Sequence, residues 1–123
     1  MKDKRIITWQ RLEGFALLAV TIFWYIKYSS FQAWGPVIFF FILPDISIAA
    51  YLINTKFGAL CYNLTHSGVL PLSVFAIWLI NPRPIILYLG LAWLAHIGMD
   101  RAFGFGLKYD DDFKHTHLGR IGK

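Results

Sequence analysis

The chain has 123 residues, of which 57% are hydrophobic and 15% are charged, with a formal net charge of +5. Soluble domains carry about a quarter charged residues, so this composition indicates lipid rather than water as the main solvent. Cys61 is the single cysteine, which excludes an internal disulfide. We interpret this lone thiol in an apolar segment as a packing residue.

The apolar residues form four long blocks, at residues 12–28, 34–53, 57–80 and 85–103. A spanning helix needs about 20 mostly apolar residues, because each residue rises about 1.5 Å through a hydrocarbon core of about 30 Å. We therefore predict an all-α membrane protein with four transmembrane helices, short loops and a basic tail at 104–123. The whole chain, 1–123, then forms a single integral membrane domain.

Residues that break or start helices lie where these blocks meet. Gly35-Pro36 opens the second block, where the missing N–H of proline costs least. Asn54-Thr55-Lys56 predicts a tight turn, and Asn81-Pro82-Arg83-Pro84 cannot continue a helix. Met1-Lys2-Asp3-Lys4-Arg5 resembles the basic region of a signal sequence, but no small-residue cleavage site follows it. We therefore predict an uncleaved signal-anchor.

Most lysine and arginine residues lie on one side of the predicted membrane. The first and third loops hold only Lys27 and Arg83, whereas the head, the second loop and the tail hold Lys2, Lys4, Arg5, Arg11, Lys56, Arg101, Lys108, Lys114, Arg120 and Lys123. The positive-inside rule places these ten residues, and with them both termini, in the cytoplasm. A basic collar beside anionic headgroups accounts for the net charge, so we expect membrane lipids as partners and no nucleic acid.

The polar residues that stand out inside the predicted spans are Glu13, Asp45, Asn63, His66, His96 and Asp100. A central aspartate costs about 2.5–3.5 kcal/mol to insert, which requires a compensating reason. His96 and Asp100 share one helix face, because they are four positions apart. Counted from the inner ends of the helices, the ionisable residues lie at depths of about 2–14 Å, in the same half of the bilayer.

Two prolines lie next to these polar residues. Pro44 precedes Asp45 directly, and Pro71 follows His66 by five positions. A proline inside a helix removes a backbone hydrogen bond and tends to kink the helix, which would free a carbonyl near the polar residues. Prolines are also common in spanning helices without any such role, so both interpretations stay open.

Asp45, His66, His96 and Asp100 together suit a divalent metal ion. Two histidines and two aspartates are ordinary zinc ligands, or manganese ligands if more oxygens join. Two aspartates and one divalent cation sum to zero charge, the state that a low-dielectric site tolerates best. Two alternatives stay open: a structural polar network between helices, and a transporter or proton-relay path through the same groups.

The tail carries His115 and His117, which share a face only if this segment is extended. They could complete a metal site from the cytoplasmic side, or belong to an exposed basic tail. Small residues at Gly58-Ala59 and Ala92–Ala95 could pack helices within one chain or between chains, so the oligomeric state stays open.

The chain resembles a known family through a set of motifs distributed over nearly its whole length. They are Arg11-Leu12-Glu13-Gly14, Leu43-Pro44-Asp45, Tyr62-Asn63-Leu64-Thr65-His66, Leu94-Ala95-His96-Ile97-Gly98-Met99-Asp100-Arg101, Gly104-Phe105-Gly106-Leu107-Lys108-Tyr109 and Phe113-Lys114-His115-Thr116-His117-Leu118-Gly119. The family is the set of small bacterial membrane proteins grouped as domain-of-unknown-function family 4260. The resemblance implies a multi-pass protein of the bacterial cytoplasmic (inner) membrane and supports the choice of residues, but it implies no reaction.

A looser similarity concerns the order P-D…H-S…H-x-x-x-D, which is formed here by Pro44-Asp45, His66-Ser67 and His96 with Asp100. The chain is similar in this order to the membrane-bound metal-dependent hydrolases regulated by the SOS repressor. That similarity implies Asp45, His66, His96 and Asp100 as the metal-binding set. The chain is shorter and lacks the polar motif that follows P-D in those proteins, so the similarity favours metal binding more than hydrolysis.

These observations lead to the prediction of a membrane-embedded, metal-dependent hydrolase-like protein. A water molecule bound to such a metal reaches a pKa near 7 and could attack an ester or phosphoester of an amphiphile from the inner leaflet. Glu13 is the expected general base, and Asn63, Arg101 and His117 are the expected orienting residues. The substrate and the identity of the metal, with zinc as the first candidate, are left open.

Overall fold

The computed structural model describes residues 3–28 and 34–122. Lys2 and Lys123, two of the basic residues used to predict the orientation, lie outside this part of the chain, as does Met1. Four helical segments are long and apolar enough to cross a membrane: Lys4–Tyr28, Trp34–Leu52, Thr55–Ile80 and Pro84–Ala102. The prediction of an all-helical chain with four such segments is confirmed.

The first helix, α1 (Lys4–Tyr28), begins well before the apolar block that starts at residue 12. The Asp3 carboxylate accepts a hydrogen bond from the Arg5 backbone N–H at 2.8 Å, and the Asp3 carbonyl accepts one from the Ile7 N–H at 3.2 Å. These bonds satisfy N–H groups that a helix start leaves free. The apolar block therefore predicted the membrane-compatible part of this helix but did not predict the residue at which the helix begins.

The second segment changes its helical form at Pro44. It starts as α2 (Trp34–Ile42) and continues as η2 (Leu43–Leu52), a 3₁₀-helix. A 3₁₀ run of this length is uncommon, and such runs often mark a functional position. Because proline has no N–H, it cannot continue the α-helical bonding pattern, and the predicted disturbance at this residue is confirmed. The Pro44 carbonyl accepts a hydrogen bond from Ser47 Oγ at 2.9 Å.

The third segment is interrupted between α3 (Thr55–His66) and α4 (Val69–Ile80). Ser67 adopts an extended conformation, with φ −89° and ψ 162°. Pro71 lies in the first turn of α4. The N–H groups of a first turn have no partner within the helix, so the missing N–H of proline costs no hydrogen bond there. The kink predicted from Pro71 is therefore confirmed, as a full break four residues before the proline.

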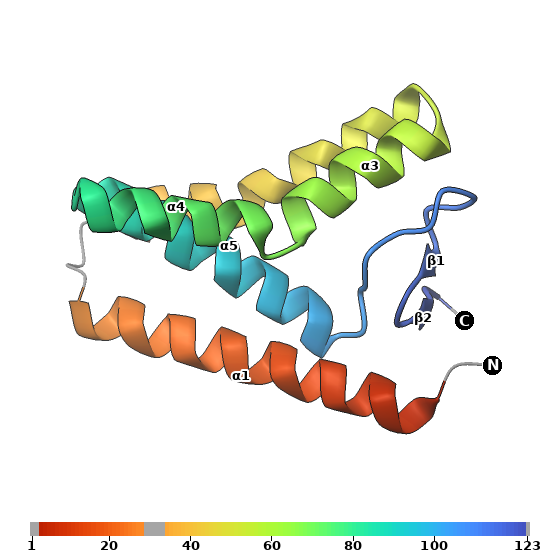
Figure 1. Ribbon diagram of the computed structural model, residues 1–123, viewed down its shortest axis with the longest axis horizontal. Helices are drawn as coiled ribbons and strands as arrows, with labels where there is room; N and C mark the ends of the chain where they lie inside the picture. Colours follow the sequence, from red (N-terminus) through yellow and green to blue (C-terminus); the bar gives the residue numbers. More distant parts are fainter. Residues whose placement is uncertain (1–2, 29–33, 123) are drawn as a thin grey trace.

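The final helix, α5 (Pro84–Ala102), is the central one, because it packs against α1, α2 and α4 (Figure 1). Its closest crossing is with α1, where Gly14 faces Gly98. A Cβ on Gly98 would lie 2.7 Å from the Leu18 nitrogen and 2.8 Å from the Gly14 oxygen. The pair allows the two backbones to touch, as small residues do in membrane bundles. It is not among the small residues that were expected from the sequence to pack helices.

The α3–η2 pair diverges from α1 and α5 towards the end of the molecule where α1 begins (Figure 1). Residues 104–122 lie at this end and form a short antiparallel hairpin of β1 (His115–Thr116) and β2 (Gly119–Arg120). Thr116 is fully buried, and Lys108 pairs with it in an isolated bridge. The tail is therefore folded onto the helices, and the alternative of an exposed basic extension is wrong.

The outer surface of the helices is apolar over much of its extent. Leu52 is 90% exposed and Ile80 is 86% exposed, and bulky side chains such as Trp9, Phe23 and Phe39 are more than half exposed. Soluble monomers rarely expose contiguous apolar surface on this scale. The surface and the lengths of the four segments agree in indicating a membrane protein.

Candidate metal centre

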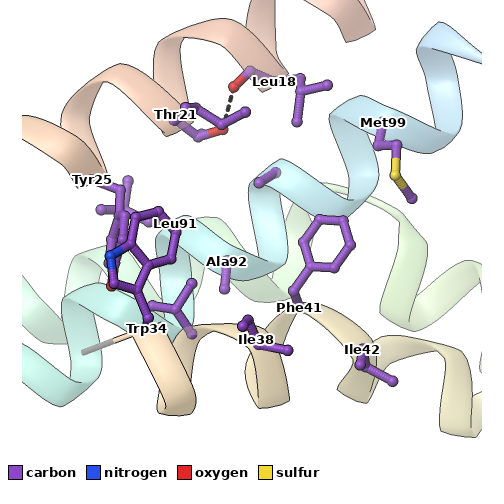
Figure 2. A pocket seen from close by; sticks show the side chains of 13 residues that line it. Leu18, Thr21, Tyr25, Trp34, Ile38, Phe41, Ile42, Leu91, Ala92 and Met99 are labelled. Carbon is purple, nitrogen blue, oxygen red and sulfur yellow. Dashed lines mark hydrogen bonds between the residues drawn. The ribbon is translucent and has the colours of Figure 1, made fainter. Parts of the chain in front are cut away.

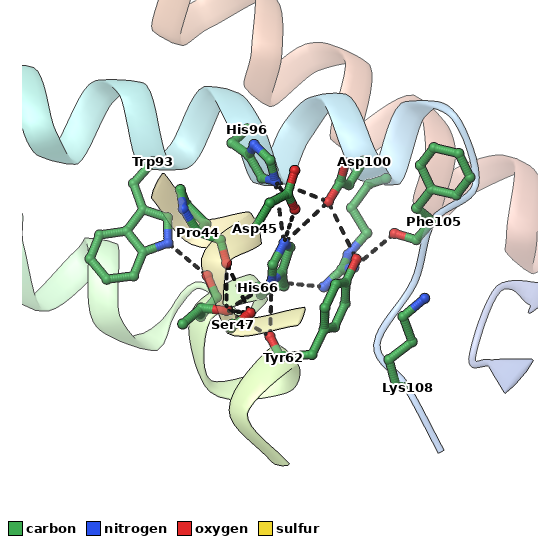
Figure 3. Close-up of polar contacts among 12 residues, drawn as sticks. Pro44, Asp45, Ser47, Tyr62, His66, Trp93, His96, Asp100, Phe105 and Lys108 are labelled. Carbon is green, nitrogen blue, oxygen red and sulfur yellow. Dashed lines mark hydrogen bonds and ion pairs between the residues drawn. The ribbon is translucent and has the colours of Figure 1, made fainter. Parts of the chain in front are cut away.

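The side chains of Asp45, His66, His96 and Asp100 meet in one cluster, with one ligand atom from each within 4.8 Å of all the others (Figure 3). Asp45 lies in the first turn of η2, His66 is the last residue of α3, and the other two lie on successive turns of α5. The 3₁₀ segment after Pro44 and the break after His66 both occur at this cluster. The four residues singled out from the sequence are thus brought together.

The distances between the ligand atoms suit a small tetrahedral site. The Nε2 atoms of His66 and His96 are 3.2 Å apart, and each lies 3.2 Å from Asp45 Oδ1. Asp100 Oδ2 lies 3.5 Å from the first and 3.4 Å from the second. Zinc bonds of about 2.0–2.2 Å give a tetrahedron with edges of about 3.3–3.6 Å. The donor set and the five distances that involve a histidine therefore suit a small divalent metal ion.

Three of the four side chains are buried, and one opens the cluster to its surroundings. The His66 and His96 side chains are 1% and 2% exposed and that of Asp100 is 10% exposed, whereas that of Asp45 is 48% exposed. Burying a carboxylate is costly unless positive charge or hydrogen bonds compensate it. Asp45 marks the side from which a further ligand could reach the cluster.

The hydrogen bonds of His66 determine which of its nitrogens faces the cluster. Nδ1 lies 2.9 Å from the Tyr62 carbonyl oxygen, and a carbonyl can only accept, so Nδ1 carries a proton. In the neutral ring the Nε2 lone pair then points towards Asp45 and His96. Metal-binding histidines commonly donate their other N–H to a backbone carbonyl in this way. Neither the Nε2 lone pair of His66 nor the carboxylate of Asp45 can donate a hydrogen bond. Their close approach therefore requires a proton or a cation between them.

The helix break after His66 is stabilised by side chains from α5. Trp93 Nε1 donates to the Thr65 carbonyl at 2.6 Å, and Arg101 Nη2 donates to the His66 carbonyl at 3.1 Å. These carbonyls have lost their helical partners, so the bonds satisfy groups that burial would otherwise penalise. Arg101, expected as an orienting residue, thus acts on the backbone of a candidate ligand. Trp93 was missed, because nothing in its sequence neighbourhood points to α3.

Asn63 holds the tail against α3. Its Nδ2 donates to the Lys108 carbonyl at 2.8 Å, and its Oδ1 accepts from the Lys108 N–H at 2.6 Å. This two-sided bond positions residues 104–122 next to the cluster. Asn63 was expected to orient the metal ligands, but its side chain pairs with the tail backbone.

Glu13 and His117 are not brought to the cluster. Glu13 is exposed on α1, and no hydrogen bond or ion pair within residues 3–28 and 34–122 joins it to the four candidate ligands. His117 Nδ1 accepts from the Leu107 N–H at 2.8 Å, and its Nε2 lies 3.1 Å from Gln10 Oε1. His117 therefore ties the tail to α1, and the position of Glu13 does not suit the general base expected from the sequence.

Lys108 was counted in the sequence only as part of a basic collar, but it is a buried residue beside the cluster. Its ammonium lies 3.9 Å from the centre of the Phe113 ring and 4.7 Å from that of the Tyr62 ring. Figure 3 shows Lys108 beside Tyr62. Burial lowers the pKa of Lys108 to about 8, although the Asp100 carboxylate opposes this effect. No sequence spacing could have revealed this contact, because Tyr62 and Lys108 belong to distant parts of the chain.

The fold and the cluster define a class: a protein with four membrane-length helical segments and a buried His/Asp group suited to a metal. The family model for the domain of unknown function DUF4260 matches residues 7–121, so the chain belongs to this family. No curated protein and no solved structure matches the chain. Family membership confirms the resemblance seen in the motifs, while the similarity to the SOS-regulated hydrolases stays a prediction.

Proposed function

We propose that this chain is a multi-pass protein of the bacterial cytoplasmic membrane that binds one divalent metal ion, with zinc as the first candidate. Asp45, His66, His96 and Asp100 are the proposed ligands. The observation that carries the proposal is that four ligand atoms from three separate segments lie within 4.8 Å of one another. The five distances that involve a histidine nitrogen are 3.2–3.5 Å, close to the edges of a zinc tetrahedron.

The proposed orientation has both termini in the cytoplasm and the whole chain as one membrane domain. It is supported by the ten lysine and arginine residues of the head, second loop and tail, against two in the other loops. The start of α1 and the β1–β2 hairpin of the tail lie at the same end of the molecule, as four spans require (Figure 1). The cluster then lies in the half of the bilayer that faces the cytoplasm.

The proposed reaction is hydrolysis of an ester or phosphoester in an amphiphile that enters from the inner leaflet. A metal-bound water would be deprotonated near neutral pH, and its oxygen would form the new bond to the carbonyl carbon or phosphorus. The bond to the ester oxygen breaks, and the departing alcohol takes up the proton. Asp45, the most exposed of the four proposed ligands, marks the side from which water or substrate would approach a bound metal.

Metal content tests the proposed centre. We expect about one equivalent of zinc in wild-type protein purified without a nickel column, and at least a tenfold lower zinc affinity after Asp45→Ala or His96→Ala. His115→Ala is the matched control, because this partly exposed histidine pairs with Asp111 and lies outside the cluster. Wild-type protein without stoichiometric metal would overturn the proposal.

A structural polar network is the second candidate, and one observation favours it. Each imidazole Nε2 lies within 3.5 Å of both carboxylates, so two protonated histidines could neutralise them without a metal. A chelator separates the candidates. If zinc is bound, removing it lowers the thermal midpoint by several degrees, because the metal stabilises only the folded form. A protein whose midpoint is indifferent to chelator and zinc would contain the network instead.

A further inference from the structure

A groove of about 600 Å³ runs between α1, α2 and α5 (Figure 2). Its walls are almost wholly apolar, with Leu18 and Tyr25 from α1, Ile38 from α2 and Leu91 from α5 among the lining residues. The hydroxyl of Thr21, which also lies in the α1 wall, is bonded to carbonyls of its own helix at 2.9 Å. A polar ligand would leave hydrogen-bonding groups unpaired in such a groove, whereas hydrocarbon would not.

One end of the groove lies next to the residues that carry the candidate metal centre. Ile42 lines the groove and precedes Asp45 by three residues. On α5, Ala95 and Met99 line it directly beside His96 and Asp100 in the sequence. The groove and the cluster thus occupy neighbouring faces of the same two segments.

Phe41 lies between the groove and the cluster. Its side chain lines the groove and points towards α5 (Figure 2), and its ring packs edge-on against His96 with the ring centres 5.2 Å apart. The groove and the centre therefore share a wall that is one aromatic side chain thick. An amphiphile lying along the groove would have its polar end at the side of the centre.

We infer that this groove holds the hydrocarbon chain of the substrate, and that the ester group at the head of that chain passes Phe41 to reach the metal centre. The inference rests on the proposed function, and it adds the substrate class: an amphiphile bound through one extended chain. The α2 wall from Trp34 to Ile42 is about 12 Å long, which suits a chain of medium length. A mostly apolar site with polar groups gathered at one end fixes the direction in which such a ligand binds.

Photolabelling in lipid nanodiscs tests the groove without requiring hydrolysis. The probe is decyl phosphate that carries a diazirine in the middle of its chain. We expect labelled residues to fall on the groove walls of α1, α2 and α5. Ile38→Trp should lower this labelling at least about tenfold, because the indole displaces several CH₂ groups of the probe.

Ile77→Trp is the matched control for this substitution. Ile38 and Ile77 are 55% and 53% exposed, so neither side chain supports the core, and Ile77 does not line the groove. Labelling should be unchanged in this variant. Labels spread evenly over the outer faces of α3 and α4, labelling absent from the groove walls, or an equal effect of the two tryptophans would each overturn the inference.

Hydrolysis provides the second measurement and separates the two proposals. With alkyl p-nitrophenyl phosphates as substrates, Ile38→Trp should raise KM for the decyl ester about tenfold and leave KM for the ethyl ester unchanged. Groove labelling that persists in Asp45→Asn, together with no hydrolysis by any form, would reject the proposed function and leave the chain-binding groove standing. Hydrolysis with no preference for chain length would reject the groove as the site of the hydrocarbon chain and leave the proposed function standing.

Discussion

His66 is the most constrained of the four candidate ligands. Its ring stacks on that of Tyr62, with the ring centres 3.7 Å apart and the planes 5° from parallel. Its Nδ1 contacts both the Tyr62 carbonyl and the Thr65 hydroxyl at 2.9 Å. These contacts fix both the plane of the imidazole and the direction of Nε2. Tyr62 thus acts on the candidate centre through His66, a role that an aromatic residue in an apolar segment does not reveal by its position in the sequence.

Substitution of Tyr62 therefore tests whether this stacking matters for metal binding. Tyr62→Leu removes the aromatic plane and should lower zinc affinity about 10–100-fold, the usual cost of losing a residue that orients a ligand. Tyr62→Phe keeps the plane and loses only the long hydroxyl contact of 3.5 Å with Asp100 Oδ2, so its affinity should stay within a factor of a few. Competition titration with a zinc chelator measures both. Equal losses in the two variants would contradict the stacking role.

Lys108 predicts a dependence of stability on pH. Its pKa is lowered by burial from 10.5 to about 8, so between these values the unfolded chain binds more protons than the folded one. Stability then rises with pH over this interval, and below about pH 8 the cost of the buried ammonium is fully present. The thermal midpoint of the wild type should rise by a few degrees relative to Lys108→Met between pH 7.5 and pH 10. Parallel midpoint curves for the two proteins would contradict this prediction.

At the level of elements, the contact of α1 with α5 depends on two glycines. A methyl group on Gly98 would meet backbone atoms of Leu18 and Gly14 at 2.7–2.8 Å, so the helices would have to move apart. Gly98→Ala should therefore destabilise the fold by about 1–3 kcal/mol, as overpacking does. Gly35→Ala is the control, because a Cβ there meets nothing within 4 Å. Unfolding in mixed detergent compares the two, and equal stability would show that the crossing tolerates separation.

Asn63 links two elements that the sequence does not connect, α3 and the folded tail. Asn63→Leu removes both of its bonds to the Lys108 backbone, which should cost about 1–3 kcal/mol locally because the Lys108 amide and carbonyl lose their partners. Hydrogen exchange should become faster in residues 104–122 and remain unchanged in α1. Asn81→Leu, at an exposed loop position, should leave the tail protected. Unchanged exchange in Asn63→Leu would mean that other contacts hold the tail.

At the scale of the whole molecule, the orientation in the membrane is directly testable. In a Cys61→Ser background, a cysteine at Pro82 should react with an impermeant maleimide in intact cells, because the third loop is expected outside. A cysteine at Gly122 should react only in inverted vesicles. Both positions are exposed, so a difference reports the side of the membrane and not burial. The opposite pattern would reverse the proposed orientation.

The four helical segments and the four clustered side chains could be anticipated from the sequence alone. Lipid forces each spanning segment to satisfy its backbone internally, so segment length and apolar content are visible in one dimension. Charged residues inside such segments are costly, which is why Asp45 and Asp100 stand out from their apolar neighbours. The spacing of His96 and Asp100 places both on one helix face, and Pro44 and Pro71 mark the points where the helices depart from regular geometry.

Only the tertiary structure decided which helix faces meet. Contacts between distant segments produce the crossing at Gly14 and Gly98 and the groove beside Phe41. They also produce the bonds of Trp93 and Arg101 to the broken α3, and the burial of Lys108 between the tail and α3. Such contacts produce no periodic pattern in the sequence, because the helix faces that pack together and the faces that meet lipid are both apolar. For the same reason the sequence did not distinguish Glu13 and His117 from the four residues of the cluster. In the folded chain Glu13 lies exposed on α1, and His117 connects the tail to α1.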